Sequence, residues 1–160
     1  MSTDFTTPEL PAIGFVADMD TDDRRLLSSY GEFIPAHEGT VIIKQGDPQN
    51  SLFMVISGLL HVQSERDGRT TLLGRLRTGD MIGEINVFDP AKASATVVSV
   101  EFSQLWRINA EMLEDFLSES PVTAANLLIA ICTQLSKRVR ATNEKVAIAQ
   151  DTISETMHWS

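Results

Sequence analysis

The middle of the chain alternates short apolar runs with glycines, whereas the parts before and after it have the spacing of helices. From Glu32 to Ile108, β-branched and aliphatic runs are separated by glycine at short intervals. This pattern is typical of an all-β barrel or roll. The strands that it predicts are Phe33–His37, Thr40–Lys44, Leu52–Ile56, Leu59–Glu65, Thr70–Arg77, Ser94–Val100 and Phe102–Ile108.

Local signals add a hairpin turn and a short first helix. Asp67 and Gly68 separate two apolar runs and tolerate positive φ, so they predict a hairpin turn. The range Asp18–Tyr30 predicts a helix that ends at Gly31, because its acidic residues gather at the end that the helix dipole favours. Since residues 1–12 have no hydrophobic period, we expect a mobile N-terminal arm over residues 1–14.

After Asn109 the spacing becomes helical again. Ala110–Leu117 predicts a short helix, and Ser120 with Pro121 predicts the start of a second one, which runs to about Thr156. This second helix has residues spaced seven apart in two interleaved ladders. The a positions are Cys132, Val139, Val146 and Ile153, and the d positions are Leu128, Leu135, Thr142 and Ala149.

A helix of this length needs a partner surface. A β-roll can cover its first half, but it cannot cover roughly 50 Å of helix at 1.5 Å per residue. A parallel seam between residues 121–156 of two copies accounts for the remainder, since β-branched residues at a positions favour two strands. The alternative is a helix that packs along its own roll.

Composition and charge narrow the class of protein. The 160 residues are 42% hydrophobic, which suits one domain, here residues 15–156. A net charge of −9 repels the phosphates of nucleic acids, so we expect no direct DNA binding. The single cysteine, Cys132, cannot form an internal disulfide, and no run of about 18 apolar residues is present to span a membrane. We therefore expect a cytoplasmic protein.

Signatures of catalysis are absent from the sequence. It contains no Gly-x-Ser-x-Gly elbow, no Gly-Lys-Ser/Thr phosphate loop, no Gly-x-Gly-x-x-Gly and no His-Glu-x-x-His pair. The histidines His37, His61 and His158, together with Cys132, lack the spacing of metal ligands. We therefore expect neither an enzyme nor a metal site, and no cofactor.

One stretch of the sequence carries a family resemblance. Gly79–Pro90 is followed by Ala91–Val97 at the start of a strand, and Gly46–Gly58 precedes both. Together they resemble the cyclic nucleotide-binding domain family, whose phosphate-binding cassette reads Gly-Glu-x-x-x-(loop)-Arg-Ser/Thr-Ala-x-Val. The resemblance covers about residues 15–155. It implies a mainly β jelly roll (a double-stranded β-helix) with an N-terminal helix and a long C-terminal dimerisation helix, and a ligand such as cAMP or cGMP.

The cassette implies a role for each residue that matches it. Gly83 lets the backbone approach the ligand, Glu84 accepts a hydrogen bond from a ribose hydroxyl, and Ser94 donates to a phosphate oxygen. The remaining ligand-binding residues that it implies are Ile85, Asn86 and Ala95. The alternative for these positions is a turn glycine, a solvated carboxylate and an ordinary strand serine.

The long helix carries a second resemblance, because Gln134–Val146 is similar to the central helix of the bacterial cyclic-AMP receptor proteins. There a threonine and a serine, one from each subunit, reach the adenine of the ligand. Thr142 matches the threonine and Asn143 replaces the serine, and both side chains can hydrogen-bond a purine edge. Thr142 is equally explained as a polar d residue that sets the register of the seam.

The sequence departs from the cassette at one position. Ala93 stands where the family has its phosphate-binding arginine, and losing such a contact costs on the order of 2–5 kcal/mol. Lys92 is the nearest replacement, or it is a solvated charge.

Two functions remain open after this departure. One is a homodimeric sensor that binds a cyclic nucleotide and relays binding through the long helices to an effector protein. The other is a degenerate domain that binds a protein partner. A transcription factor would need a DNA-reading domain after Thr156, where only four residues follow.

Overall fold

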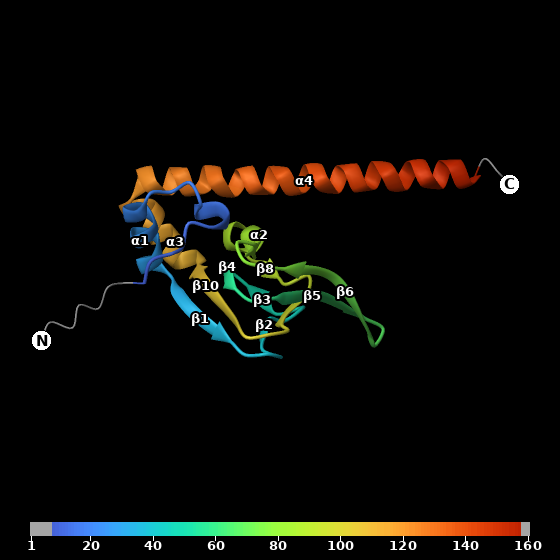
Figure 1. The fold of residues 1–160 in the computed structure, drawn as a ribbon, viewed down its shortest axis with the longest axis horizontal. Coiled ribbons are helices and arrows are strands. Elements are labelled where there is room, and N and C mark those ends of the chain that lie inside the picture. Colours follow the sequence, from blue (N-terminus) through green and yellow to red (C-terminus); the bar gives the residue numbers. More distant parts are fainter. Residues whose placement is uncertain (1–7, 158–160) are drawn as a thin grey trace, which may run out of the picture.

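A computed structural model describes residues 8–157, so His158 lies outside the described part. Figure 1 shows a β-roll with helices at one end and one long helix that lies across the roll and extends beyond it. The helices are α1 (Thr21–Tyr30), α2 (Glu84–Phe88), α3 (Ala110–Glu119) and α4 (Pro121–Met157), and a 3-10 turn, η1, spans Gly14–Val16. This mainly β architecture with a long C-terminal helix confirms the predicted fold class.

The roll consists of two four-stranded antiparallel sheets and one small two-stranded sheet. Their orders are β1-β10-β4-β7, β2-β9-β5-β6 and β3-β8. The strands are β1 (Glu32–Ala36), β2 (Val41–Ile43), β3 (Pro48–Gln49), β4 (Ser51–Ser57), β5 (Leu60–Arg66), β6 (Arg69–Leu76), β7 (Met81–Ile82), β8 (Ala91–Lys92), β9 (Thr96–Ser99) and β10 (Ser103–Asn109). The predicted strands are all present, whereas the sequence pattern missed the two-residue strands β3, β7 and β8, which are too short to show alternation.

The hairpin turn forms as the sequence predicts, and two helices begin at side-chain caps. Asp67 and Gly68 have φ of 53° and 71° and close the hairpin between β5 and β6, which matches the turn with two positive φ angles. The Asp20 side chain caps α1 by accepting from the N–H of Asp23 at 2.8 Å. Asn109 caps α3 in the same way, accepting from the N–H of Met112 at 2.9 Å.

The mobile arm was expected over residues 1–14; residues 1–7 lie outside the described part of the chain, and residues 8–14 pack on the domain. Leu10 is fully buried in the core, and its carbonyl accepts a hydrogen bond of 2.9 Å from the Nε of Arg24. A second nitrogen of Arg24 lies 2.8 Å from the carboxylate of Glu9. The sequence pattern missed this docking because a single apolar side chain produces no period.

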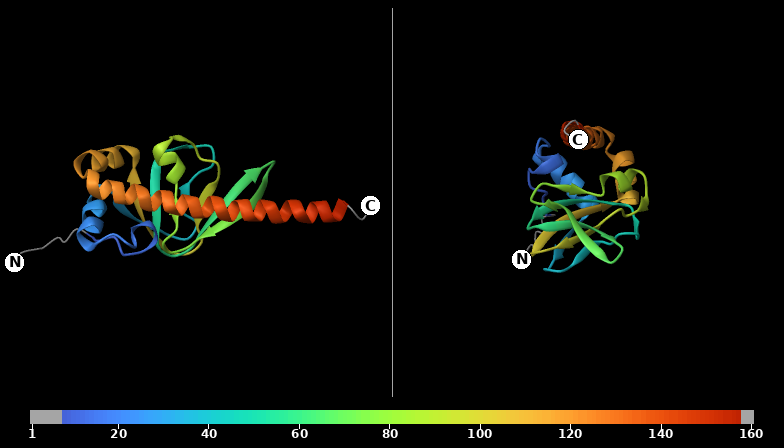
Figure 2. Two further views of the ribbon diagram at one scale, coloured as in Figure 1. Left: turned by 90° about the horizontal axis from the view of Figure 1, so that it is seen from above. Right: turned by 90° about the vertical axis from the view of Figure 1, so that its right-hand side faces the viewer.

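The core has two parts. One apolar cluster lies between the β1-β10-β4-β7 sheet and the helices, and it includes Trp106, Leu127 and Ile131. The other fills the inside of the roll between the two large sheets, where Val55 and Leu105 are fully buried. Figure 2 shows α4 crossing one side of the roll and continuing past it. The first half of α4 is therefore part of the domain's core.

The second half of α4 has little to pack on within its own chain. Its buried residues, Ala124, Leu127 and Ile131, all lie in the first third of the helix, and residues 139–157 are exposed throughout. The single chain thus matches the expectation that the roll covers only the first half of this helix. None of the helices within residues 8–157 has the length and hydropathy that crossing a membrane requires.

The docking of α4 predicts a difference between two isoleucines that lie two residues apart. Ile131 is 1% exposed, whereas Ile129 is 65% exposed. Ile131→Val should lower the free energy of unfolding by about 0.5–1.5 kcal/mol, because a buried methylene is lost, and Ile129→Val should change it by less than about 0.5 kcal/mol. Urea denaturation followed by circular dichroism measures both values. Equal effects would contradict the packing of α4 on the roll.

Candidate ligand-binding site

A cavity of about 230 Å³ opens between the roll, α2 and α4. Its floor is formed by apolar side chains of the strands, and its rim is formed by α2, by the bend between β8 and β9, and by one residue of α4. The lining residues are Ile43, Gln49, Val62, Leu76, Met81, Ile82, Gly83, Glu84, Ile85, Asn86, Ala93, Ser94, Ala95, Val97 and Arg138. Six of the predicted ligand-binding residues therefore line one cavity.

Gly83 is required where it stands, between β7 and α2. Its φ is +80°, and a Cβ added to it would lie 2.1 Å from the carbonyl oxygen of Ser51. Only glycine fits this left-handed conformation against a neighbouring strand. The tight turn places Glu84 at the first position of α2, where its side chain is held at the edge of the cavity.

Glu84 forms an ion pair with Arg138 of α4. One guanidinium nitrogen of Arg138 donates to Oε1 of Glu84 at 2.6 Å, and another donates to the carbonyl oxygen of Met81 at 2.7 Å. The Glu84 side chain is 10% exposed and that of Arg138 is 43% exposed. Because the carboxylate is mostly shielded from water, this pair ties α4 to the rim of the cavity more firmly than a fully exposed pair would.

Arg138 is the functional candidate that the sequence analysis missed. It lies seven residues after Ile131, which itself lies seven after Ala124, and both of those side chains are buried against the domain. Arg138 thus continues the face of α4 that points to its own roll. The predicted a and d ladders lie on the neighbouring face of the helix. The face with Ala124, Ile131 and Arg138 has the same spacing of seven residues.

The bend between β8 and β9 differs in detail from the prediction. Ser94 and Ala95 belong to this bend, and β9 begins at Thr96, so the predicted strand Ser94–Val100 is wrong at its first residues. Ala93 is 7% exposed, and its N–H donates to the carbonyl oxygen of Asp47 at 2.8 Å. The position where the cassette has arginine is therefore a neutral part of the cavity wall.

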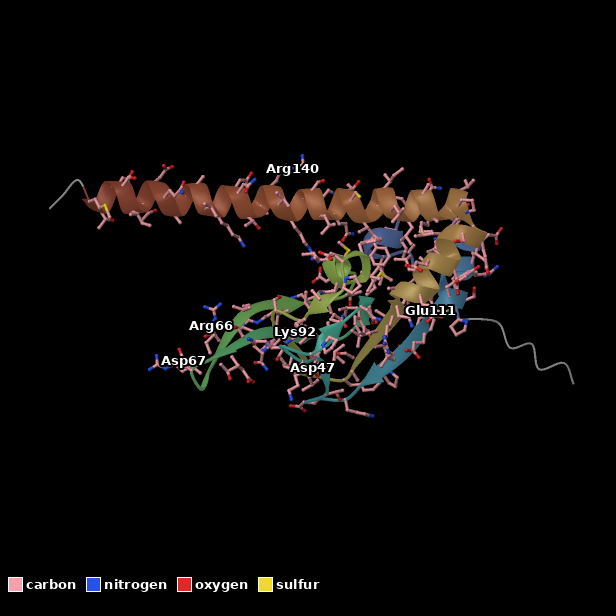
Figure 3. All side chains as sticks on the ribbon, turned by 180° about the vertical axis from the view of Figure 1, so that it is seen from behind. Asp47, Arg66, Asp67, Lys92, Glu111 and Arg140 are labelled. Carbon is pink, nitrogen blue, oxygen red and sulfur yellow. The ribbon has the colours of Figure 1, made fainter. Side chains whose placement is uncertain are left out.

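Three predicted residues do not line the cavity of the single chain. Thr142 and Asn143 are exposed on α4, and the Thr142 hydroxyl donates to the carbonyl oxygen of Arg138 at 2.9 Å. Lys92 is exposed in β8, opposite Pro48 of β3, and Figure 3 places it on the roll, well apart from α4. Their contact with a ligand stays a prediction.

The chemistry of the cavity is that of binding. Glu84 and Arg138 are the titratable residues of its lining, and the amides of Gln49 and Asn86 and the hydroxyl of Ser94 add neutral polar groups beside an apolar floor. Within residues 8–157, no group of three or more histidine, cysteine, aspartate or glutamate residues is placed to hold a metal ion. Fold and cavity together define a β-roll domain that can hold a small polar ligand.

Comparison with known proteins identifies the family. The sequence matches the family described as "Cyclic nucleotide-binding domain" over residues 34–120, more than half of the chain. The chain therefore belongs to the cyclic nucleotide-binding domain family, whose domains are regulatory. The resemblance on which the sequence analysis relied is confirmed.

The similar proteins carry names of the CRP-like type. The chain is 26% identical over 110 residues to a CRP-like cAMP-activated global transcriptional regulator of Mycobacterium tuberculosis, covering 68% of this chain and 47% of the relative. It is 30% identical over 149 residues to the CRP-like protein Clp of Xanthomonas campestris pv. campestris, covering 88% and 64%. The chain thus spans about half to two thirds of these relatives.

A solved structure agrees with the fold. The c-di-GMP responsive global regulator CLP of Xanthomonas campestris has a TM-score of 0.69 and 27% identity to this chain, covering 80% of this chain and 63% of that one.

Proposed function

We propose that this domain is a cytoplasmic sensor that binds a cyclic nucleotide, cAMP or cGMP, in the cavity beside α2. The observation that carries the proposal is the convergence of Gly83, Glu84, Ser94 and Ala95 on one cavity, in the order that the family's cassette requires. Glu84 would accept from a ribose hydroxyl, and Ser94 would donate to the phosphate. The apolar floor suits the less polar face of the sugar and base.

We further propose that binding is relayed through α4 in a homodimer and on to an effector protein. The Glu84–Arg138 ion pair joins the rim of the cavity to α4, so a ligand at the rim can change the position or stability of the helix. A ligand shifts such an equilibrium only by its difference in affinity for the two states. In a parallel dimer, Thr142 or Asn143 of the second copy would complete the site at the base.

Isothermal titration of the protein with cAMP and with cGMP tests the proposal. We expect saturable binding of one of them at one site per chain. Glu84→Gln should weaken it at least about tenfold, because a hydrogen bond to a charged acceptor is replaced by a neutral one. Glu111→Gln is the matched control, since Glu111 is exposed on α3, away from the cavity (Figure 3), and affinity should stay within about twofold.

The same titration distinguishes the sensor from a second candidate function, a domain that binds a protein partner. The neutral, buried Ala93 in the cavity wall favours a degenerate domain that has lost its ligand and binds a protein instead. No heat with either nucleotide at millimolar concentration would reject the sensor and favour this dimerisation or protein-binding module.

A further inference from the structure

The proposed ligand is an anion, but the cavity lacks the arginine with which the family's cassette binds the phosphate. A cyclic nucleotide carries one negative charge, and Ala93 offers no cation. The nearby arginines do not replace it. Leu76 lines the cavity, so its neighbour Arg75 lies on the opposite face of β6. Arg77 follows the strand and does not line the cavity, and both arginines are exposed. Lys92 does not line the cavity either. Within residues 8–157, Arg138 is the one cationic residue of the wall.

From this position we infer that Arg138, from α4, binds the anionic group of the ligand in place of the missing cassette arginine. The inference rests on the proposed function and names the residue that gives the site its affinity for a phosphate. The phosphate would then be bound both by Arg138 of α4 and by the hydroxyl of Ser94 in the bend.

The geometry leaves Arg138 able to take this role. A guanidinium has five N–H groups, and the structure records acceptors for two of them, Oε1 of Glu84 and the carbonyl oxygen of Met81. Both acceptors lie on the roll, so they hold the guanidinium at the cavity while its side chain stays 43% exposed. A planar guanidinium that is already positioned binds phosphate oxygens with little further loss of freedom.

This arrangement has a consequence for signalling. In a domain whose phosphate-binding cation stands at the position of Ala93, the phosphate is bound by the roll alone. Here the same contact would connect the ligand directly to α4, in addition to the Glu84–Arg138 pair. Occupancy of the cavity would therefore stabilise the docked position of α4 at residue 138, which lies within the exposed part of the helix that begins at Ser136.

The inference is tested by comparing the unaltered chain with an Arg138 variant, each titrated with a charged and with an uncharged ligand. Titrations of the full chain use cAMP and adenosine, which lacks the phosphate. Arg138→Gln should weaken cAMP binding about tenfold to a hundredfold, because a charge-assisted contact is lost, and it should weaken adenosine binding much less. Loss of the Glu84 contact alone would lower both affinities by the same factor. Arg140→Gln is the control, because Arg140 points away from the roll (Figure 3).

A second variant shows whether a loss of affinity in Arg138→Gln comes from the missing charge or from a disturbed fold. Adding Ala93→Arg to Arg138→Gln returns a cation to the wall and should recover most of the cAMP affinity. Equal losses for cAMP and adenosine, or cAMP affinity within about twofold of the unaltered chain in Arg138→Gln, would overturn the inference and leave the proposed function standing. An unaltered chain that binds neither ligand would overturn both.

Discussion

Gly83→Ala should destabilise the domain by about 2–5 kcal/mol. An alanine at φ +80° carries about 1–2 kcal/mol of left-handed strain, and its Cβ would lie 2.1 Å from the carbonyl oxygen of Ser51. Ser51 is 1% exposed and begins β4, which is held between β10 and β7, so it cannot move aside without disturbing that sheet. Forced repacking of this kind adds about 1–3 kcal/mol. Urea denaturation gives the value.

Gly39→Ala separates the two causes of this loss. Gly39 has a φ of +82°, almost the same as that of Gly83, but an added Cβ there would meet nothing within 4 Å. This variant should therefore lose only the strain of about 1–2 kcal/mol. If Gly39→Ala and Gly83→Ala lowered stability equally, the close approach of Gly83 to β4 would be disproved.

Replacing two a residues of α4 by aspartate should convert a dimer into a monomer. Val139, Val146 and Ile153 are 58%, 50% and 55% exposed in the single chain, on a 37-residue helix about 55 Å long. In the proposed parallel seam, each a residue faces its own copy. Val139→Asp with Val146→Asp would bring two pairs of like charges into an apolar contact, which costs several kcal/mol per buried ion.

Sedimentation equilibrium measures this change as mass. We expect the unaltered chain at twice its 17.6 kDa and the double variant at 17.6 kDa. The control is Ala141→Asp with Ala147→Asp, which adds the same charges at exposed c and b positions of the same heptads and should leave the dimer intact. A monomeric unaltered chain, or a double variant that remains dimeric, would reject the seam.

The sequence predicted those features that depend on local chemistry. The positive φ of Asp67 and Gly68 and the helix start at Pro121 follow from the residue types themselves, so the hairpin and the start of α4 were located closely. The residues from Gly83 to Ala95 were singled out because they resemble the family's cassette, and the structure brings the six predicted ligand-binding residues among them to one cavity. The burial of Leu10 depends on contacts with distant residues and left no local signal.

Arg138 shows why the site was only partly predicted. It lies 54 residues from Glu84 in sequence, and their contact depends on the angle at which α4 crosses the roll. Heptad spacing indicates which residues share a helix face, but it does not say which of two adjacent apolar faces meets the domain. Ala124, Ile131 and Arg138 also lie seven residues apart, as the a residues of the ladder with Val139 do. The heptad spacing of the sequence therefore also indicates this second face of the helix.

The most direct test of a nucleotide site in this cavity is a titration of the ¹⁵N-labelled protein with cAMP and cGMP, followed by ¹H–¹⁵N correlation spectra. We predict that signals of Gly83, Glu84, Ser94 and the Arg138 side chain shift with added ligand, while that of Gly68, in the distant hairpin turn, does not. Unchanged spectra at millimolar nucleotide, or shifts confined to residues outside the cavity lining, would contradict the account.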